Sequence, residues 1–302
     1  MCLVALALAV HPRFPLVIAA NRDEHFARPT APLDWWSPAS TGPAVLSGRD
    51  LEAGGTWMGV SAVGRLALLT NIRAPSQHDP DALSRGRIVT EWLTGSDEPD
   101  RFWRSVASRR HNGFNLIAAD LMRGEWFWAA NRGIEPIRLS TGIHGLSNAE
   151  LDTPWPKVVT LKQRLATALA ESGSVDGLAA DLFDALADRT IVTDGGLPDT
   201  GMPIEIERQL SSAFIDMPAR GYGTRCSTLL IGERVDGVDR LHVLERTFGA
   251  DPTAPPRLRR TIVDHWPPTS AATAKAAVMR PVLDADLHFA PARRDRTVSA
   301  SP

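Results

Sequence analysis

The sequence predicts an α+β protein whose sheets are mostly antiparallel. Short apolar segments typical of buried strands occur in groups, and segments with helical periodicity occur in pairs between those groups. This order of strands, helices, strands, helices and strands differs from the strict strand–helix alternation that builds parallel sheets. The sequence contains no internal repeat and no glycine-rich phosphate-binding motif. Two sheets that face each other, with a pair of helices outside each, would satisfy the pattern.

The first group of strands begins close to the N-terminus. Residues 3–9 are apolar, and residues 11–15, which include two prolines, interrupt regular structure before a second apolar segment at residues 16–20. These two segments predict a buried hairpin. Three further short strands, separated by Gly54-Gly55 and Gly64, are expected at residues 44–47, 56–61 and 65–70.

A pair of helices and a second group of strands are expected next. A helix at residues 81–93 would end at Gly95, and one at residues 100–109 would begin behind Pro99. Met122-Arg123-Gly124 is a turn signal between two apolar segments, which predicts a hairpin. The strands of this group are expected at residues 114–120, 125–130, 134–139 and 143–146.

The second helix pair is followed by the last strands. Apolar residues recur at helical spacing through residues 153–172, and Ser174 is suited to cap a helix at residues 175–187. The last strands are expected at residues 226–233 and 240–248, around the turn Asp236-Gly237, after a Gly-, Asp- and Pro-rich loop at about 193–203 and before a proline-rich segment at 252–268. We expect a single domain over residues 1–285 and a flexible tail at 286–302.

The composition argues against several functional classes. The chain has 302 residues and a net charge of -2, which gives no strong attraction to nucleic acid or anionic lipid. Its two cysteines, Cys2 and Cys226, are too few for a disulfide framework, and no metal-ligand spacing occurs, so neither metal nor cofactor is expected. The apolar start is shorter than the roughly 20 residues of a membrane span and lacks the basic region of a signal peptide. A cytoplasmic protein without stable membrane insertion is expected.

Cys2 is the residue that suggests a chemistry. Methionine aminopeptidases remove Met1 when the second residue is small, and Cys2 would then carry a thiol and an α-amine together. The α-amine has a reference pKa of about 8, so it can accept the proton of the thiol, and one residue supplies nucleophile and base. The alternative is that Cys2 is a small buried side chain. Cys226, which falls in an expected buried strand, is interpreted as a core residue.

Polar residues at the ends of expected strands could complete such a site. Because Arg22 ends the second strand of the first hairpin, it would lie beside the start of the first strand, at Cys2. The candidates are Arg22 and Arg225 for lowering the thiol pKa, Asn71 and Asn148 for binding an oxyanion, and Asp23 or Glu24 for holding the α-amine. Ion pairs for the charged residues and turn capping for the asparagines are the structural alternatives.

Four residues are further candidates for contacts with a substrate. Trp57 follows Gly54-Gly55 and either packs under that turn or stacks on a ligand. Arg85 is expected near the start of a helix, where it either binds an anion or stays solvated. Glu24 and Arg73, which adjoin the polar strand ends, complete the set.

Several short motifs follow one another along nearly the whole chain. They are Met1-Cys2, Asn21-Arg22-Asp23-Glu24, Gly54-Gly55-Thr56-Trp57-Met58-Gly59, Thr70-Asn71-Ile72-Arg73, Ser84-Arg85-Gly86, Asn112-Gly113-Phe114-Asn115, Gly145-Leu146-Ser147-Asn148 and Tyr222-Gly223-Thr224-Arg225. Together these motifs resemble the NRDE family, also called the Transport and Golgi organisation protein 2 family, which is grouped with the N-terminal nucleophile hydrolases.

The resemblance implies a four-layer αββα sandwich and amide-bond chemistry. Penicillin V acylases and conjugated bile acid hydrolases are the functional analogues, and they cleave linear amides with an N-terminal cysteine. By similarity, the catalytic group is Cys2, Arg22, Asn71, Asn148 and Arg225. One departure concerns the carboxylate, because those hydrolases place an aspartate three residues after the arginine, where this sequence has His25. Asp23 is adjacent to Arg22 instead, so the residue that holds the amine stays open.

Two functions follow from these observations. The first is hydrolysis of a linear amide or thioester through an acyl-enzyme on Cys2. The alternative is a non-catalytic protein that binds and transfers haem, acyl-CoA or an acyl lipid in the same pocket, as the resemblance implies for eukaryotic members. Both require a small-molecule ligand and no nucleic acid. The sequence does not predict the acyl group or the oligomeric state.

Overall fold

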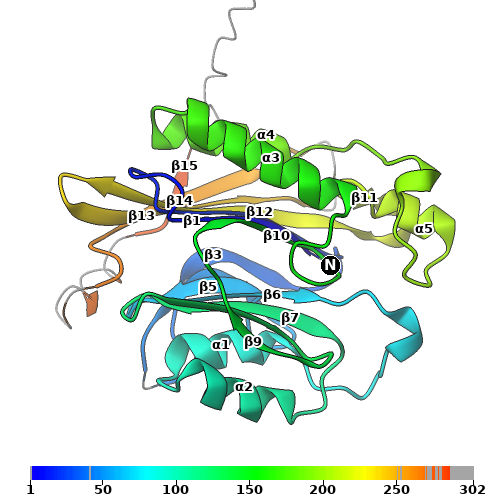
Figure 1. The fold of residues 1–302 in the computed structure, drawn as a ribbon, viewed down its shortest axis with the longest axis horizontal. Helices are drawn as coiled ribbons and strands as arrows, with labels where there is room; N and C mark the ends of the chain where they lie inside the picture. The colour runs from blue at the N-terminus through cyan, green and yellow to red at the C-terminus, as the bar shows by residue number, and fades with distance from the viewer. Residues whose placement is uncertain are drawn as a thin grey trace, which may run out of the picture.

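Two antiparallel sheets form the centre of the molecule. The computed structural model describes residues 2–40, 42–249, 251, 254–268, 270, 274–275, 278 and 281–285. Within these residues, an eight-stranded sheet faces a seven-stranded sheet, and all pairs between named strands are antiparallel. The α+β class with mostly antiparallel sheets is therefore confirmed (Figure 1).

The eight-stranded sheet, here called sheet A, contains both ends of the described chain. Its strand order is β10-β1-β2-β12-β13-β14-β15, and β11 pairs with β12 beside this path. The strands are β1 (Cys2–Leu8), β2 (Leu16–His25), β10 (Gly142–Leu146), β11 (Asp216–Met217), β12 (Tyr222–Val235), β13 (Val238–Thr247), β14 (Arg257–Asp264) and β15 (Leu283–Ala285). The central strands β1, β2 and β12 are almost completely buried, as their apolar sequences predict.

The seven-stranded sheet B follows the chain order without a crossover, from β3 to β9. Its strands are β3 (Thr30–Trp36), β4 (Val45–Asp50), β5 (Met58–Ser61), β6 (Arg65–Asn71), β7 (Phe114–Asp120), β8 (Glu125–Ala130) and β9 (Ile134–Arg138). The hairpin of β7 and β8 turns at residues 121–124, as the sequence predicts.

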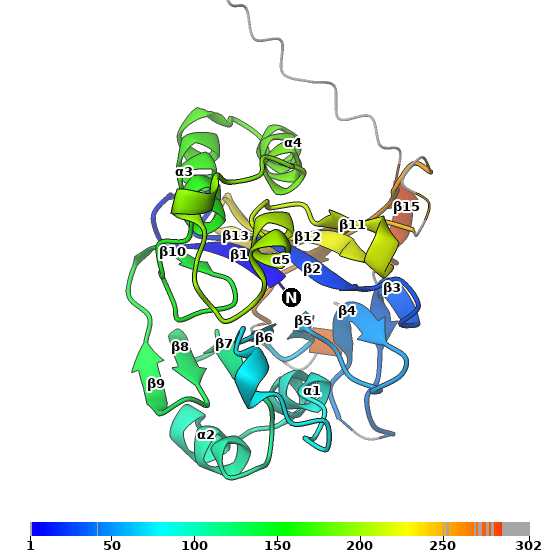
Figure 2. The same ribbon diagram turned by 90° about the vertical axis from the view of Figure 1, so that its right-hand side faces the viewer.

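Helices cover the outer face of each sheet. In Figures 1 and 2, α3 and α4 lie over sheet A, and α1 and α2 lie against sheet B on the other side of the molecule. The helices are α1 (Gly86–Thr94), α2 (Pro99–Ala107), α3 (Pro156–Glu171), α4 (Val175–Leu186) and α5 (Ile204–Gln209), with short 3-10 turns at Pro75–Gln77, Asp194–Gly196 and Pro218–Arg220. None of the helices in the described part of the chain is long and apolar enough to cross a membrane.

The alternation of side chains along β1 divides the core. Leu3 and Ala5 pack against α3 and α4, whereas Val4 and Leu6 pack between the two sheets. A third apolar cluster joins sheet B to α1 and α2. This division decides which residues at the start of β1 can reach a site between the sheets.

Several elements differ from the sequence-based expectations. Helix α1 begins at Gly86 rather than at residue 81, because residues 81–85 form a turn without helical hydrogen bonds. Strands β3 and β14 and helix α5 are not among the elements that the sequence predicts, since β14 and α5 are rich in charged residues and β3 contains Pro32 and buries only Leu33. In β14, which lies inside the proline-rich segment, three arginines precede Thr261, and Leu258 and Val263 are buried. The predicted tail at 286–302 lies outside the described residues, and the single domain and cytoplasmic location stay predictions.

Candidate functional site

Cys2 is the first residue of β1 and pairs with Arg22 of β2. The predicted hairpin thus brings these two residues side by side. On its other edge, Arg22 pairs with Cys226 of β12. Because Cys2 shares its face with Val4 and Leu6, its thiol is on the side of sheet A that faces sheet B. Met1 lies outside the described residues.

A cavity of about 390 Å³, here called the Cys2 pocket, opens at this point. Seven of the ten residues predicted for the site line it: Cys2, Arg22, Asp23, Glu24, Trp57, Asn71 and Arg85. A neighbouring cavity of about 670 Å³ shares Glu24, Asn71 and Arg85 with it and adds Arg73. The sequence motifs that are far apart along the chain therefore meet at one end of the two sheets.

Arg22 connects sheet A to the loop before β5 of sheet B. Its guanidinium carbon lies 4.3 Å from the centre of the Trp57 ring. The same group is 3.8 Å from Asp50 and 3.9 Å from Glu24, and it donates a hydrogen bond to Thr30 at 3.3 Å. Arg22 is only 5% exposed, so it is a fixed positive charge in the wall of the pocket beside Cys2.

Asp23 is the buried carboxylate of the site. It is 1% exposed, and its Oδ1 accepts a hydrogen bond from Thr224 at 2.8 Å. The hydroxyl of Tyr222 donates to the Asp23 carbonyl at 3.0 Å. Burial raises the pKa of Asp23, and the positive charges of Lys157 and Arg73 act in the opposite direction. Glu24 keeps 27% of its side chain exposed, so Asp23 is the more buried of the two adjacent carboxylates.

The two thiols differ in what surrounds them. Burial raises the pKa of the Cys2 thiol, and the charge of Asp23 adds to this effect. The charge of Arg22 and a hydrogen bond from the backbone of Asp23 lower the same pKa. Burial raises the pKa of Cys226 well above its usual value, and this residue packs inside sheet A. Arg22 acts to lower the pKa of both thiols, so what distinguishes Cys2 is that it lines the pocket.

The two asparagines have different positions relative to the pocket. Asn71 ends β6 and lines the Cys2 pocket. The side chain of Asn148 instead donates to the Asn71 carbonyl at 2.8 Å, and the Asn148 carbonyl accepts from the backbone of Arg73 at 2.8 Å. Because Asn148 follows β10 of sheet A, these bonds tie the ends of the two sheets together. The Asn148 amide thus donates to this link, whereas Asn71 is among the residues that line the cavity.

Arg225 and Arg73 lie outside the Cys2 pocket. Arg225 occupies a bulge in β12 and donates to the carbonyls of His25 and Arg28 at 2.7 and 3.0 Å, so it holds the turn after β2. Arg73 forms a buried ion pair with Glu207 of α5. Neither arginine is among the residues that line the Cys2 pocket.

Lys157 is a component that the sequence-based prediction missed. It lies in the first turn of α3, is 6% exposed, and donates from Nζ to the Leu210 carbonyl at 2.8 Å. Burial lowers the pKa of Lys157 to about 8. A signal was present in the sequence, because Lys157 continues the apolar stripe of Leu161 and Leu165 at helical spacing.

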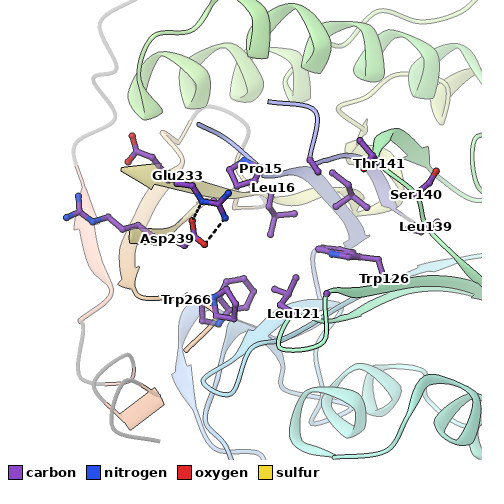
Figure 3. A pocket seen from close by; sticks show the side chains of 17 residues that line it. Pro15, Leu16, Leu121, Trp126, Leu139, Ser140, Thr141, Glu233, Asp239 and Trp266 are labelled. Atoms are coloured by element: carbon purple, nitrogen blue, oxygen red, sulfur yellow. Dashed lines mark hydrogen bonds and ion pairs between the residues drawn. The ribbon is translucent and has the colours of Figure 1, made fainter. Parts of the chain in front are cut away.

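A further cavity lies at the opposite end of β1. It has a volume of about 390 Å³, and Leu16, Leu121, Trp126 and Trp266 point into it (Figure 3). None of the predicted site residues lines this cavity.

The described residues contain no group of three or more His, Cys, Asp or Glu side chains that could hold a metal ion.

Comparisons with known proteins agree with the motifs. A sequence model of the family described as Transport and Golgi organisation 2 matches residues 1–250. The human Transport and Golgi organization protein 2 homolog is 38% identical over 265 residues, which cover 82% of this chain and 93% of the relative. The mouse homolog is 36% identical over 264 residues, with the same coverage of 82% and 93%.

Comparison with solved structures gives a match of low sequence identity. It is the Caenorhabditis elegans ortholog of N-acylethanolamine-hydrolyzing acid amidase, with 9% sequence identity and a TM-score of 0.42, covering 76% of this chain and 92% of that chain. Family membership rests on the sequence matches, which span most of this chain and of its relatives. The chain belongs to the Transport and Golgi organisation 2 family.

Proposed function

We propose that the protein is an N-terminal-cysteine hydrolase that cleaves a linear amide or thioester after removal of Met1. The observation that carries this proposal is that Cys2 lines a 390 Å³ cavity together with Arg22 and Asn71, while the buried carboxylate of Asp23 adjoins it. Two facing sheets between two pairs of helices support the four-layer αββα sandwich of N-terminal nucleophile hydrolases as the fold.

The proposed reaction has two steps. In the first, the Cys2 sulfur attacks the substrate carbonyl carbon, the α-amine of Cys2 takes the thiol proton, and the carbonyl oxygen becomes an oxyanion. The amine then passes the proton to the leaving nitrogen or sulfur, whose bond to the carbonyl breaks. In the second step, water attacks the acyl-thioester with the amine as base. The acid is released, and the thiol regains its proton.

Each neighbouring residue has a role in this scheme. Arg22 stabilises the thiolate, Asn71 donates its amide to the oxyanion, and Asp23 holds the α-amine. Asn148 and Arg225 support the site indirectly, since their hydrogen bonds hold the Asn71 carbonyl and the turn after β2. Trp57, Glu24, Arg73 and Arg85 are proposed to contact the substrate in the two adjoining cavities.

A second candidate function is binding and transfer of an anionic acyl thioester or haem without catalysis. The observation that favours it is a pair of arginines beside Gly113 in the larger cavity. Arg85 donates to the Gly113 carbonyl at 3.1 Å, and the Arg132 side chain packs against the same glycine. Among the described residues, neither guanidinium has a carboxylate within 4.0 Å, so both can bind an anionic ligand.

The first test is the intact mass of the untagged protein, because the proposed mechanism requires the loss of Met1. The processed protein is then incubated with a panel of fatty-acyl amides and acyl thioesters. The hydrolase predicts a burst of product and a covalent acyl adduct on Cys2, both abolished in Cys2→Ala and kept in the matched control Cys226→Ala. Retention of Met1 would exclude the mechanism. Saturable binding of an acyl thioester or haem that is unchanged in Cys2→Ala, without turnover, would support the carrier.

A further inference from the structure

A buried ammonium group adjoins the candidate site from the helix side of sheet A. Lys157 stands at the start of the stripe of α3 that packs on sheet A, where Leu161 and Leu165 follow it. Asp23 shares its face of β2 with Ala19, which packs against the same helices. Lys157 and Asp23 are therefore on the same side of sheet A, while the Cys2 thiol is on the opposite side.

The charges around Lys157 are unequal. Its nearest oxygen partner is the Leu210 carbonyl, and within the described part of the chain no carboxylate comes within 4.0 Å of its ammonium. The charged and titratable groups that act on it are Cys2 of β1, Asp23 of β2, Arg73 after β6 and Glu207 of α5. Arg73 and Glu207 form an ion pair with each other, so Lys157 is the remaining positive charge on this side of the sheet, opposite the charge of Asp23.

A lysine at this position has an energetic cost. The interior disfavours an ammonium, and burial lowers the pKa of Lys157 to about 8. An apolar side chain would continue the stripe of α3 without this cost. The ammonium does act on the site, since the charge of Lys157 lowers the pKa of Asp23, and Cys2 and Lys157 interact electrostatically.

We propose that Lys157 is a positioning residue for the proposed hydrolase: its buried positive charge keeps Asp23 ionised and offsets the negative charge of Asp23, which would otherwise disfavour the Cys2 thiolate. Removing this charge raises the pKa of the carboxyl and of the thiol, because both anions lose an opposite charge. The α-amine of processed Cys2 responds in the same direction, since it loses a like charge. Every titrating group of the site therefore moves to higher pH. The other charged residues that line the Cys2 pocket stay in place; they are Arg22, Glu24, Arg28, Asp50, Glu52 and Arg85.

The test measures the rate of Cys2 alkylation by iodoacetamide against pH in the processed protein, with the modified cysteine identified by peptide mass. Lys157→Gln keeps a donor for the Leu210 carbonyl and removes the charge. The inflection of its profile is expected at a higher pH than that of the unchanged protein. Lys157→Arg restores the charge and is expected to return the inflection toward its original position. Lys162→Gln is the matched control, because Lys162 pairs with Asp152 on the surface.

This inference rests on the proposed function, but alkylation requires no turnover, so the two can fail separately. If the protein hydrolyses no substrate but Lys157→Gln still shifts the alkylation profile, the proposed function is contradicted, whereas the effect of the Lys157 charge on Cys2 is supported. An unshifted profile in folded Lys157→Gln, or an equal shift in Lys162→Gln, would overturn the inference. If Lys157→Gln does not fold, Lys157→Met serves in its place, since its unbranched side chain suits the apolar stripe. A lower melting temperature with an unchanged profile would assign Lys157 a structural role only.

Discussion

Arg22 of sheet A and Trp57 of the loop before β5 stack on each other at the mouth of the Cys2 pocket, with 4.3 Å between the guanidinium carbon and the ring centre. This contact explains why an arginine next to Cys2 and a tryptophan after two glycines belong to one site. The Trp57 ring covers one face of the Arg22 guanidinium and fixes the orientation of that guanidinium beside the Cys2 thiol. Trp57 is therefore part of the support for Arg22, whether or not a ligand also stacks on it.

The stacking can be measured with a double-mutant cycle. Arg22→Met and Trp57→Leu, singly and together, are expected to show a coupling of about 1 kcal/mol in urea unfolding, which is typical of a desolvated cation–π pair. The control cycle combines Arg22→Met with Trp36→Leu, because Trp36 stacks on Arg49 instead. That cycle is expected to be additive. Equal coupling free energies in the two cycles would show that Arg22 and Trp57 interact no more strongly than Arg22 and Trp36.

The two glycines before Trp57 are required for different reasons. A Cβ on Gly55 would lie 2.3 Å from the Gly86 carbonyl oxygen, so this glycine allows the loop to pack against the start of α1 beside Arg85. Gly54 has a positive φ of 72° and no atom near its missing Cβ. Gly54→Ala is expected to cost about 1 kcal/mol through backbone strain alone.

Gly55→Ala is expected to cost more, about 2 kcal/mol or above, because a backbone atom rather than a flexible side chain must move. The measurement is urea unfolding of both variants together with the rate of Cys2 alkylation. Gly55→Ala should also change the alkylation rate, since Arg85 lines the pocket next to the displaced residue. If Gly54→Ala were the more damaging change, close approach would not be the reason for Gly55.

The sequence predicts the parts of the site that depend on strand pairing. A hairpin between two apolar segments dictates that Arg22 is opposite Cys2, and the register of β1 and β2 confirms it. The sequence could not assign Arg225 and Asn148 in the same way. The end of a predicted strand places a residue at an edge of the sheet, but the direction of its side chain depends on the local backbone geometry. A bulge in β12 turns Arg225 toward the His25 carbonyl, and no residue pattern in the sequence indicates that bulge.

Lys157 was missed for another reason. Periodicity identified its helix from the apolar residues, and a lysine in the first turn reads as an exposed residue. Its burial depends on α5, whose Leu210 carbonyl covers the ammonium, and α5 is too short and polar to be predicted from periodicity. The spacing from Lys157 to Leu161 and Leu165 places Lys157 on the buried stripe, but the contact of its ammonium depends on long-range packing that the local pattern does not give.

Substitutions of the two asparagines are expected to affect different properties, stability for Asn148 and activity for Asn71. Asn148→Ala removes the hydrogen bond to the Asn71 carbonyl and is expected to lower stability by about 1–3 kcal/mol, because the Asn148 side chain that makes the bond is buried. Asn71→Ala leaves that bond intact, since the bond uses the backbone of Asn71. It is expected to change stability by less than about 0.5 kcal/mol and to lower kcat by roughly 100-fold or more. Urea unfolding and turnover of an accepted acyl substrate measure both effects, and the reverse assignment would contradict the proposed roles.

The buried ammonium also predicts how stability depends on pH. Lys157 has a pKa of about 8 in the folded protein, below its ordinary value of 10.5. Between these two values the unfolded chain binds the proton more tightly, so stability rises with pH across this window. At pH 7 both states are protonated, and the full cost of the charge, roughly 3 kcal/mol, is present.

Lys157→Met removes this cost and also loses the hydrogen bond to Leu210, which is worth about 1–3 kcal/mol. The variant is therefore expected to equal or exceed the unchanged protein in stability at pH 7 and to be less stable than it at pH 10. Urea unfolding at the two pH values measures the difference, and Lys162→Met, which removes a surface charge paired with Asp152, is the control. A stability difference that does not change with pH would mean that Lys157 is not charged and buried as described. A crossover, together with impaired Cys2 reactivity, would show that the site retains a destabilising charge because its chemistry depends on it.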